Sequence, residues 1–163
     1  MTGRVGLGID FHRWEADRAL VIGGVAIPHE RGLAGHSDAD VLTHAICDAL
    51  LGAAGLGDIG VQFPDTDDRY RGISSLRLLE RVVTLVAEAG FRASNVDCVV
   101  IGERPKLTPH FAAIRATLAP LLGIDPSCVG LKATTTEGMG ALGREEGLAS
   151  MCVGLIERGP EGP

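Results

Sequence analysis

Apolar residues recur along this chain with two different periods, one typical of strands and the other of helices. Residues 5–14 alternate between apolar and polar in the manner of a strand, and residues 20–27 predict one or two short strands joined through a Gly-Gly turn. Residues 96–101 are almost continuously apolar, which predicts a strand buried on both faces. Two more strands are expected over residues 128–133 and 147–157.

Three segments instead space their apolar residues three or four positions apart, which predicts amphipathic helices. They cover residues 37–54, 74–89 and 108–122, and each is followed by a glycine that can end a helix. The first begins at Ser37 or Asp38, because either side chain can accept hydrogen bonds from the free N–H groups of a helix start.

The order of these elements predicts an α/β (α+β) fold, in which helices cover one face of a mixed β-sheet. With 163 residues and no visible linker, the chain is expected to form one domain over residues 1–158, followed by a frayed tail over residues 159–163. Residues 57–72 are rich in Gly, Asp and Pro, which predicts an exposed loop between the first two helices.

Composition narrows the class of protein. Hydrophobic residues make up 45% of the chain and charged residues 22%, which is ordinary for a soluble globular protein. A net charge of −6 without a run of Lys or Arg argues against nucleic acid as a partner, and no apolar stretch is long enough to span a membrane. The four cysteines form no CxxC pair and no secretory leader is visible, so we expect reduced thiols and a cytoplasmic location.

Three side chains could together bind a metal ion. Alternation places Asp10 and His12 on the same face of the first strand, and His44 lies on the flank of the first helix. One carboxylate and two imidazoles can bind zinc, and three protein ligands would leave a position open, as in catalytic zinc sites. Spacing alone favours two unrelated features, an Asp–His hydrogen bond at a strand edge and a half-buried helix histidine.

Two further segments have both a structural and a functional interpretation. The acidic residues within 58–67 are typical of a solvated loop, although a carboxylate on a loop can also bind sugar hydroxyls. Residues 134–137, Thr-Thr-Thr-Glu, fit a threonine-rich strand end. The same hydroxyls and backbone N–H groups could cradle a phosphate, with Glu137 as an oxygen ligand for Mg²⁺.

Taken together, these segments resemble the 2-C-methyl-D-erythritol 2,4-cyclodiphosphate synthase family of the non-mevalonate isoprenoid pathway. The similarity covers residues 5–157 and is specific because several long motifs occur in the same order. They are GIDFH at 8–12, IGGVAIPHERGLAGHSDADVLTHAICDALLGAAGLGDIG at 22–60, FPDTD at 63–67, RPKL at 104–107 and KATTTEGMGALGREEGLA at 132–149.

The resemblance implies a role for each matching residue. Asp10, His12 and His44 match the zinc ligands, and Glu137 matches the ligand of a second divalent ion. His36 and Thr135 match the residues that stabilise the transition state. The remaining positions match substrate contacts, and they are Phe11, Ser37, Asp58, Ile59, Gly60, Phe63, Pro64, Asp65, Thr66, Asp67, Gly102, Glu103, Arg104, Pro105, Lys106, Leu107, Thr108, Lys132, Thr134, Thr136, Ala141 and Arg144, together with Asp10, His12, His36, Thr135 and Glu137.

The resemblance also implies a reaction and an assembly. The substrate is 4-diphosphocytidyl-2-C-methyl-D-erythritol 2-phosphate, which cyclises and releases CMP with Zn²⁺ or Mn²⁺ at the Asp/His/His site and Mg²⁺ or Mn²⁺ on the diphosphate. Family members are homotrimers whose sheets pack around the three-fold axis, with active sites between subunits. Isoprenoid diphosphates bind an axial cavity in some relatives, but Ala141, Leu142 and Glu145 depart from the family pattern there.

Two other functions remain open at this point. A zinc-dependent phosphohydrolase would use the same three ligands with a metal-bound water as its nucleophile. A non-catalytic trimeric protein would bind the metabolite without releasing CMP.

Overall fold

A five-stranded sheet with the order β4-β1-β7-β5-β6 organises the computed structural model, which describes residues 3–64 and 72–159. The strands are β1 (Arg4–Glu15), β4 (Gly32–Leu33), β5 (Phe91–Ile101), β6 (Val129–Thr134) and β7 (Gly147–Arg158). β5 and β6 run parallel, whereas the other neighbours run antiparallel. The predicted mixed sheet is therefore confirmed, and β5 begins earlier than the sequence pattern indicated.

A separate hairpin follows β1. It consists of β2 (Leu20–Ile22) and β3 (Val25–Ile27), which pair antiparallel as a two-stranded sheet. Gly23 and Gly24 form its turn with φ values of 59° and 75°, a region that favours glycine. The predicted pair of short strands is confirmed.

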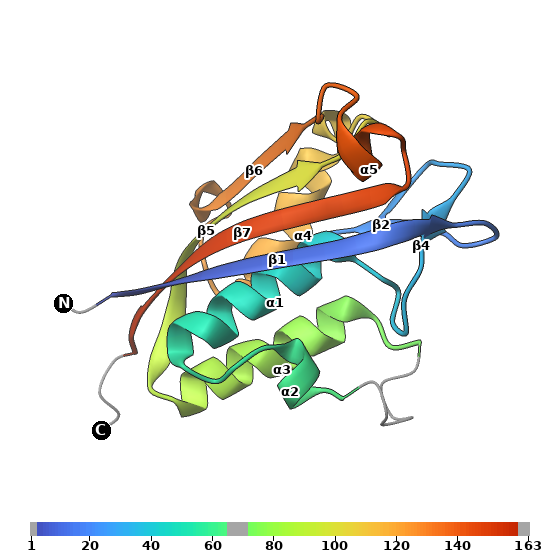
Figure 1. The fold of residues 1–163 in the computed structure, drawn as a ribbon. Coiled ribbons are helices and arrows are strands. Elements are labelled where there is room, and N and C mark those ends of the chain that lie inside the picture. The colour runs from blue at the N-terminus through green and yellow to red at the C-terminus, as the bar shows by residue number, and fades with distance from the viewer. Residues whose placement is uncertain (1–2, 65–71, 160–163) are drawn as a thin grey trace.

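The long helices pack together on one face of the five-stranded sheet (Figure 1). They are α1 (Val41–Ala54), α3 (Ser75–Glu88) and α4 (Phe111–Leu122), and the two shorter ones are α2 (Ile59–Gln62) and α5 (Gly140–Gly143). Two 3-10 turns, Thr108–His110 and Pro126–Cys128, precede α4 and β6. The prediction of helices over one face of a mixed sheet is confirmed.

α1 lies directly against β1 because that strand carries glycine where the two elements cross. A Cβ atom placed on Gly6 or Gly8 would lie 1.9 Å from the carbonyl oxygen of Ala49 or Ala45, respectively. Glycine therefore permits backbone-to-backbone contact between strand and helix. Since Gly6 and Gly8 alternate with exposed residues, the same alternation turns the next even-numbered residues of β1 toward α1.

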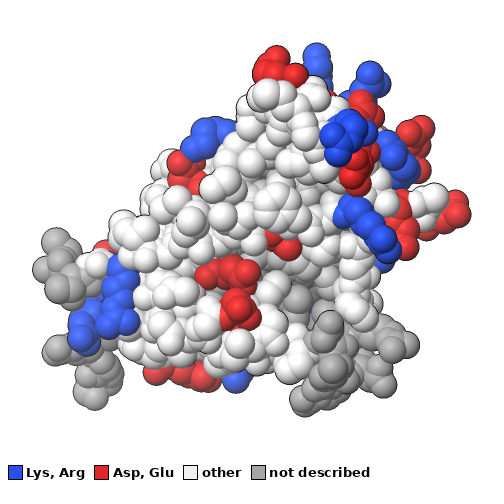
Figure 2. Space-filling view, viewed as in Figure 1, with Lys and Arg blue, Asp and Glu red and all other residues white. Residues whose placement is uncertain are grey.

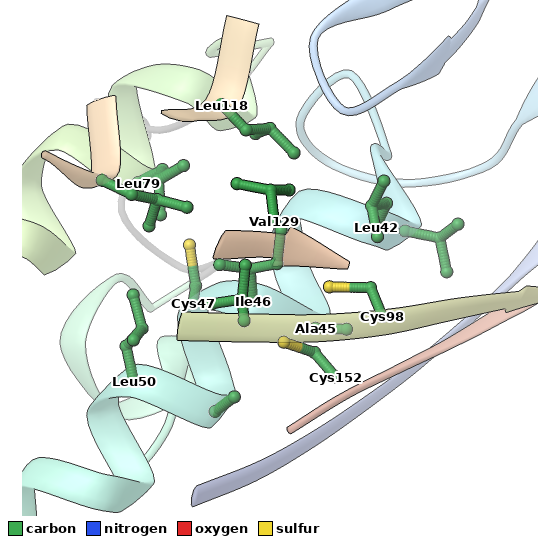
Figure 3. Packing of buried hydrophobic residues seen from close by; sticks show 14 of the residues in the cluster. Leu42, Ala45, Ile46, Cys47, Leu50, Leu79, Cys98, Leu118, Val129 and Cys152 are labelled. Carbon is green, nitrogen blue, oxygen red and sulfur yellow. The ribbon is translucent and has the colours of Figure 1, made fainter. Parts of the chain in front are cut away.

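The core lies between the sheet and the helices (Figure 3). The stripe predicted for the first helix is buried, and Ile46 and Leu50 are fully inaccessible. Leu79 of α3 and Leu118 of α4 pack into the same cluster. Three of the four cysteines, Cys47, Cys98 and Cys152, are buried free thiols, and Cys128 is partly exposed.

The opposite face of the sheet is apolar but exposed in the single chain. On β1, Val5 is 68% exposed, Leu7 56% and Phe11 65%. Within β5, buried positions alternate with exposed or half-buried ones, so the prediction that residues 96–101 are buried on both faces is wrong for one chain. Helices cover only one face, and that is why the apolar run is buried on that face alone.

Two predicted boundaries are also wrong. α1 begins at Val41, and its N-cap is Asp40, whose side chain accepts a hydrogen bond from the N–H of Thr43. Residues 57–72 are not entirely a loop, since Asp58 caps α2 by accepting a hydrogen bond from the N–H of Val61. Ser37, Asp38 and Asp40 all precede α1, and contacts with other segments decide which one becomes the cap.

Charged side chains gather in Figure 2 around α5 and the nearby ends of β1 and β4, at the upper right of the view. Among the described residues, no helix is both long enough and apolar enough to cross a membrane.

Candidate metal centre and ligand-binding loops

Asp10, His12 and His44 converge at one point between β1 and α1. The two β1 residues lie on the face that Gly8 turns toward α1, and His44 immediately precedes the helix residue that Gly8 contacts. Asp10 Oδ2 lies 2.9 Å from His12 Nε2 and 3.0 Å from His44 Nδ1, and the two ring nitrogens are 3.2 Å apart. The alternative of two unrelated features is therefore wrong, because one oxygen and two nitrogens face a common centre.

This donor set fits a divalent metal ion. Tetrahedral zinc with ligand bonds of about 2.0–2.2 Å would separate neighbouring ligand atoms by roughly 3.3–3.6 Å. The observed separations are only slightly shorter, so small side-chain movements would admit an ion. The other ring nitrogen of His12, Nδ1, lies 2.6 Å from the carbonyl oxygen of Ala34. A carbonyl only accepts, so Nδ1 carries the proton and Nε2 keeps a lone pair for the metal.

The electrostatics of the centre favour an ionised Asp10. Burial disfavours the Asp10 carboxylate, but contacts with the His12 and His44 rings outweigh burial and hold the pKa of Asp10 well below its usual value. Burial opposes a charged His12, yet the neighbouring Asp10 carboxylate raises the pKa of His12 above the ordinary value. The carboxylate is thus ionised and ready to bind a cation.

Residues 36–38 pass beside this centre and are bound to the start of α3. The carbonyl oxygen of His36 accepts a hydrogen bond of 2.7 Å from Gly72 N, and the N–H of Asp38 donates to Ile73 O at 3.3 Å. Ser37 is 8% exposed, and its Oγ lies 3.1 Å from His44 Nε2. His36 and Ser37, both predicted to contact substrate phosphates, are therefore held next to the metal ligands.

The second group of predicted residues lies on the loops that follow β5 and β6. Glu103 joins these loops, since its Oε1 accepts hydrogen bonds from Thr136 N at 3.0 Å, Thr136 Oγ1 at 3.1 Å and Gly138 N at 3.3 Å. The backbone hydrogen bond from Thr136 contributes most to a pKa of Glu103 below its usual value. The loop after β5, expected to contact substrate, is thereby joined to the Thr-rich segment that could cradle a phosphate.

Within that segment, Thr135 and Glu137 contact each other, with Thr135 Oγ1 donating to Glu137 Oε1 at 3.1 Å. Glu145 forms ion pairs near the loop after β5. Its carboxylate oxygens lie 3.4 Å from Arg104 Nε and 3.9 Å from Arg31 Nη2. These ion pairs connect residues 29–31 with the loop after β5 and with the chain before β7.

Other predicted residues lie on β6, next to α5 and at the start of α2. The Lys132 ammonium pairs with Asp97 Oδ1 at 2.6 Å on an exposed part of the sheet, so contact with a phosphate would require it to leave that carboxylate. Arg144 pairs with Glu146 at 2.8 Å beside α5, which includes Ala141. Asp58, Ile59 and Gly60 form the start of α2, and Asp65, Thr66 and Asp67 lie outside the described residues.

Strand register shows how far apart the two groups lie in one chain. Phe11 of β1 pairs with Ala149 of β7, which pairs with Ile101 of β5, which in turn pairs with Thr134 of β6. Both groups therefore occupy the same end of the sheet. Three strand spacings of about 4.8 Å separate β1 from β6 by roughly 14 Å.

Sequence reasoning did not identify two polar residues next to His44. Ser75 is fully buried with its Oγ 2.9 Å from His44 Nε2, and Asp38 accepts a hydrogen bond from the Ser75 N–H. The distance along the chain hid this contact, because Ser75 belongs to a different helix. The available signal was the pair of serines at the start of the second predicted helix, only one of which is needed as a cap.

Comparison with known proteins agrees with this geometry. The model of the YgbB family matches residues 3–157. A 2-C-methyl-D-erythritol 2,4-cyclodiphosphate synthase of Desulfosudis oleivorans is 58% identical over 153 residues, covering 94% of this chain and 91% of the relative.

Solved structures are also similar. The bifunctional IspDF of Campylobacter jejuni superposes with a TM-score of 0.93 at 40% identity, over 97% of this chain and 43% of that chain. A 2-C-methyl-D-erythritol 2,4-cyclodiphosphate synthase in a CDP-bound form gives a TM-score of 0.87 at 40% identity, over 94% of this chain and 100% of that chain. The chain therefore belongs to the YgbB family and is an enzyme of the 2-C-methyl-D-erythritol 2,4-cyclodiphosphate synthase type.

Proposed function

We propose that this enzyme converts 4-diphosphocytidyl-2-C-methyl-D-erythritol 2-phosphate to 2-C-methyl-D-erythritol 2,4-cyclodiphosphate and CMP. The observation that carries the proposal is the convergence of Asp10, His12 and His44 in a chain of this family. A CDP-bound form of a structural neighbour supports a cytidine diphosphate substrate. No protein nucleophile is required, because the substrate supplies its own.

The reaction is an intramolecular phosphoryl transfer. An oxygen of the 2-phosphate forms a bond to the β-phosphorus. The bond from that phosphorus to the bridging oxygen breaks, and the bridging oxygen leaves as part of CMP. Bound divalent ions supply Lewis-acid stabilisation of the phosphate oxygens. Asp10, His12 and His44 would hold Zn²⁺ or Mn²⁺, and Glu137 would hold Mg²⁺ or Mn²⁺.

The protein's remaining contribution is to position the reacting groups and exclude water. His36 and Thr135 would donate hydrogen bonds to the phosphate oxygens as their charge develops. The tie through Glu103 would hold the loop after β5 on the cytosine while the segment of Thr135 and Glu137 meets the diphosphate.

We also propose that the enzyme is a homotrimer whose sheets pack around a three-fold axis, with each active site between two subunits. The exposed apolar face of β1, including Val5, Leu7 and Phe11, is suited to burial against another copy. A separation of roughly 14 Å between β1 and β6 leaves the two groups of site residues apart within one chain. A neighbouring subunit can bring the missing half to each metal centre.

Sedimentation tests this assembly. Leu7→Asp places a charge on the apolar face, and we expect it to convert a trimeric mass into a monomeric one. Val61 is 67% exposed on α2, away from that face, so Val61→Asp is the matched control and should remain trimeric. A monomeric wild-type protein would contradict the proposed assembly.

Product analysis in ¹⁸O-labelled water tests the reaction. Cyclisation gives CMP and a cyclic diphosphate without label, whereas a phosphohydrolase would incorporate ¹⁸O into its phosphate product. A non-catalytic binding protein would release no CMP. His44→Ala should lose both bound zinc and CMP release while the trimer persists, and normal turnover by metal-depleted His44→Ala would defeat the metal assignment.

A further inference from the structure

The nitrogen of His44 that faces away from the metal centre contacts a buried chain of polar residues. His44 Nε2 lies 2.9 Å from Ser75 Oγ, and both residues are buried, with exposures of 7% for His44 and 0% for Ser75. Ser75 in turn contacts the carboxylate of Asp38 through both its backbone N–H, at 3.0 Å, and its hydroxyl. Two segments far apart in sequence, residues 37–44 and the start of α3, therefore meet behind the metal ligand.

The donors and acceptors in this chain of contacts determine where the protons lie. An ionised carboxylate can only accept, so the hydroxyl proton of Ser75 is directed to Asp38. Ser75 Oγ is then left with lone pairs toward His44, and Nε2 must be the donor. A neutral imidazole carries one N–H, so Nδ1 keeps its lone pair, and this is the nitrogen that faces Asp10 and His12.

A second hydroxyl near the same nitrogen does not change this assignment. Ser37 Oγ lies 3.1 Å from His44 Nε2 and accepts a hydrogen bond from Ala39 N, also at 3.1 Å. Its own proton can point to Ser75 Oγ, 3.5 Å away. Ser75 alone has its proton directed to a carboxylate, so Ser75 is the hydroxyl that fixes the orientation of the ring.

We propose that Asp38 and Ser75 are positioning residues of the metal centre, which hold His44 in the form that offers Nδ1 to the ion. The inference rests on the metal site of the proposed function and adds two residues that do not touch the ion. Hydrogen-bond partners of this kind typically change metal affinity by about 10- to 100-fold when they are removed. Asp38 and Ser75 thereby link the start of α3 to zinc affinity.

A pair of neighbouring serines provides a matched test. Ser75→Ala removes the hydroxyl that accepts from Nε2, whereas Ser74→Ala removes the exposed N-cap of α3, which accepts from Leu76 N at 3.3 Å. Zinc affinity is measured on metal-free full-length protein by competition with a chromophoric chelator, and urea unfolding monitors the fold. We expect Ser75→Ala to bind zinc about 10- to 100-fold more weakly than wild type and Ser74→Ala to match wild type.

A double-mutant cycle separates positioning from simple loss of polarity. Asp38→Asn offers an amide N–H₂ that can donate to Ser75 Oγ, which frees the serine proton to compete for Nε2. Asp38→Asn should therefore weaken zinc binding in the wild-type background and add little when Ser75 is already alanine. Equal zinc affinities of the Ser74→Ala and Ser75→Ala proteins, or additive effects of the Asp38 and Ser75 substitutions, would overturn the proposal.

A measurement on the unaltered protein keeps the proposal testable if a variant fails to fold. ¹⁵N NMR of the histidine rings in metal-free protein, at a pH where His44 is neutral, should show the proton on Nε2, and a proton on Nδ1 would overturn the inference. None of these measurements uses the substrate. A chain that shows the expected zinc affinities but releases no CMP would therefore contradict only the proposed function.

Discussion

Asp40 is a buried charged residue whose replacement should destabilise the fold strongly. Its carboxylate is inaccessible to solvent and accepts four hydrogen bonds, from Gly23 N at 2.9 Å, Gly24 N at 2.7 Å, Thr43 N at 3.0 Å and Thr43 Oγ1 at 2.7 Å. One side chain thus caps α1 and fixes the turn of the β2–β3 hairpin. Burial raises the pKa of Asp40, although the four donors oppose that effect.

The cost of Asp40→Ala follows from these contacts. Losing an N-cap typically costs about 1 kcal/mol, and each buried N–H left without an acceptor costs about 1–3 kcal/mol. Relief from burying a carboxylate offsets part of this loss, so we expect a net loss of about 3–5 kcal/mol. Asp40→Asn retains one oxygen acceptor and should cost less.

Urea unfolding of metal-free protein measures this loss. All variants are compared at one protein concentration, because association would shift apparent stability. Asp125 is the control, since it caps the 3-10 turn Pro126–Cys128 by the same kind of hydrogen bond but is exposed. Asp125→Ala should cost much less than Asp40→Ala, because its partners remain in contact with water. A loss below about 1 kcal/mol for Asp40→Ala would refute the reasoning that buried donors depend on this carboxylate.

Three further changes test the packing and the ligand loops. Gly8→Ala should lower the melting temperature strongly, because its Cβ would lie 1.9 Å from Ala45 O of α1. The control is Gly52→Ala, also on α1, where a Cβ would meet open space and should raise stability by about 0.5–1 kcal/mol. Calorimetry with CDP should show weaker binding for Glu103→Ala and near-normal binding for Glu103→Gln, which keeps an acceptor for Thr136; equal affinities would contradict its linking role. Glu137→Gln should raise the Mg²⁺ concentration needed for CMP release while metal analysis finds zinc unchanged, and a loss of zinc would contradict its assignment to the second ion.

The regular elements could be predicted because their signals are local. The apolar stripe of α1 and the glycines that end α1 and α4 are visible in the sequence, and Gly55 and Gly123 indeed adopt left-handed conformations. The start of α1 could not be predicted in the same way. Asp38 and Asp40 are equally good caps by residue type, but the turn at Gly23 and Gly24 engages one of them.

The candidate site could likewise be predicted only as far as it depends on local sequence patterns. Alternation correctly places Asp10 and His12 on one face, and the position of His44 on the helix flank made it a possible third ligand. Only the family resemblance favoured the convergence of all three. Their convergence depends on how closely α1 approaches β1, which Gly8 permits through contact with backbone atoms of the helix. The sequence records that glycine, but not which helix it meets.

The same reasoning explains why Glu103 and Ser75 have roles that spacing did not reveal. Each belongs to one element and hydrogen-bonds to another that lies about 30 positions away in the chain, Glu103 to the segment around Thr136 and Ser75 to His44. Each bond therefore joins two separate segments within one group of site residues rather than supporting a single helix or strand. In the proposed trimer the ligand loops of one subunit meet the metal centre of another. The hydrogen bonds of Glu103 and Ser75 would hold each of these two groups in place before assembly. Association would then only have to align two preformed groups.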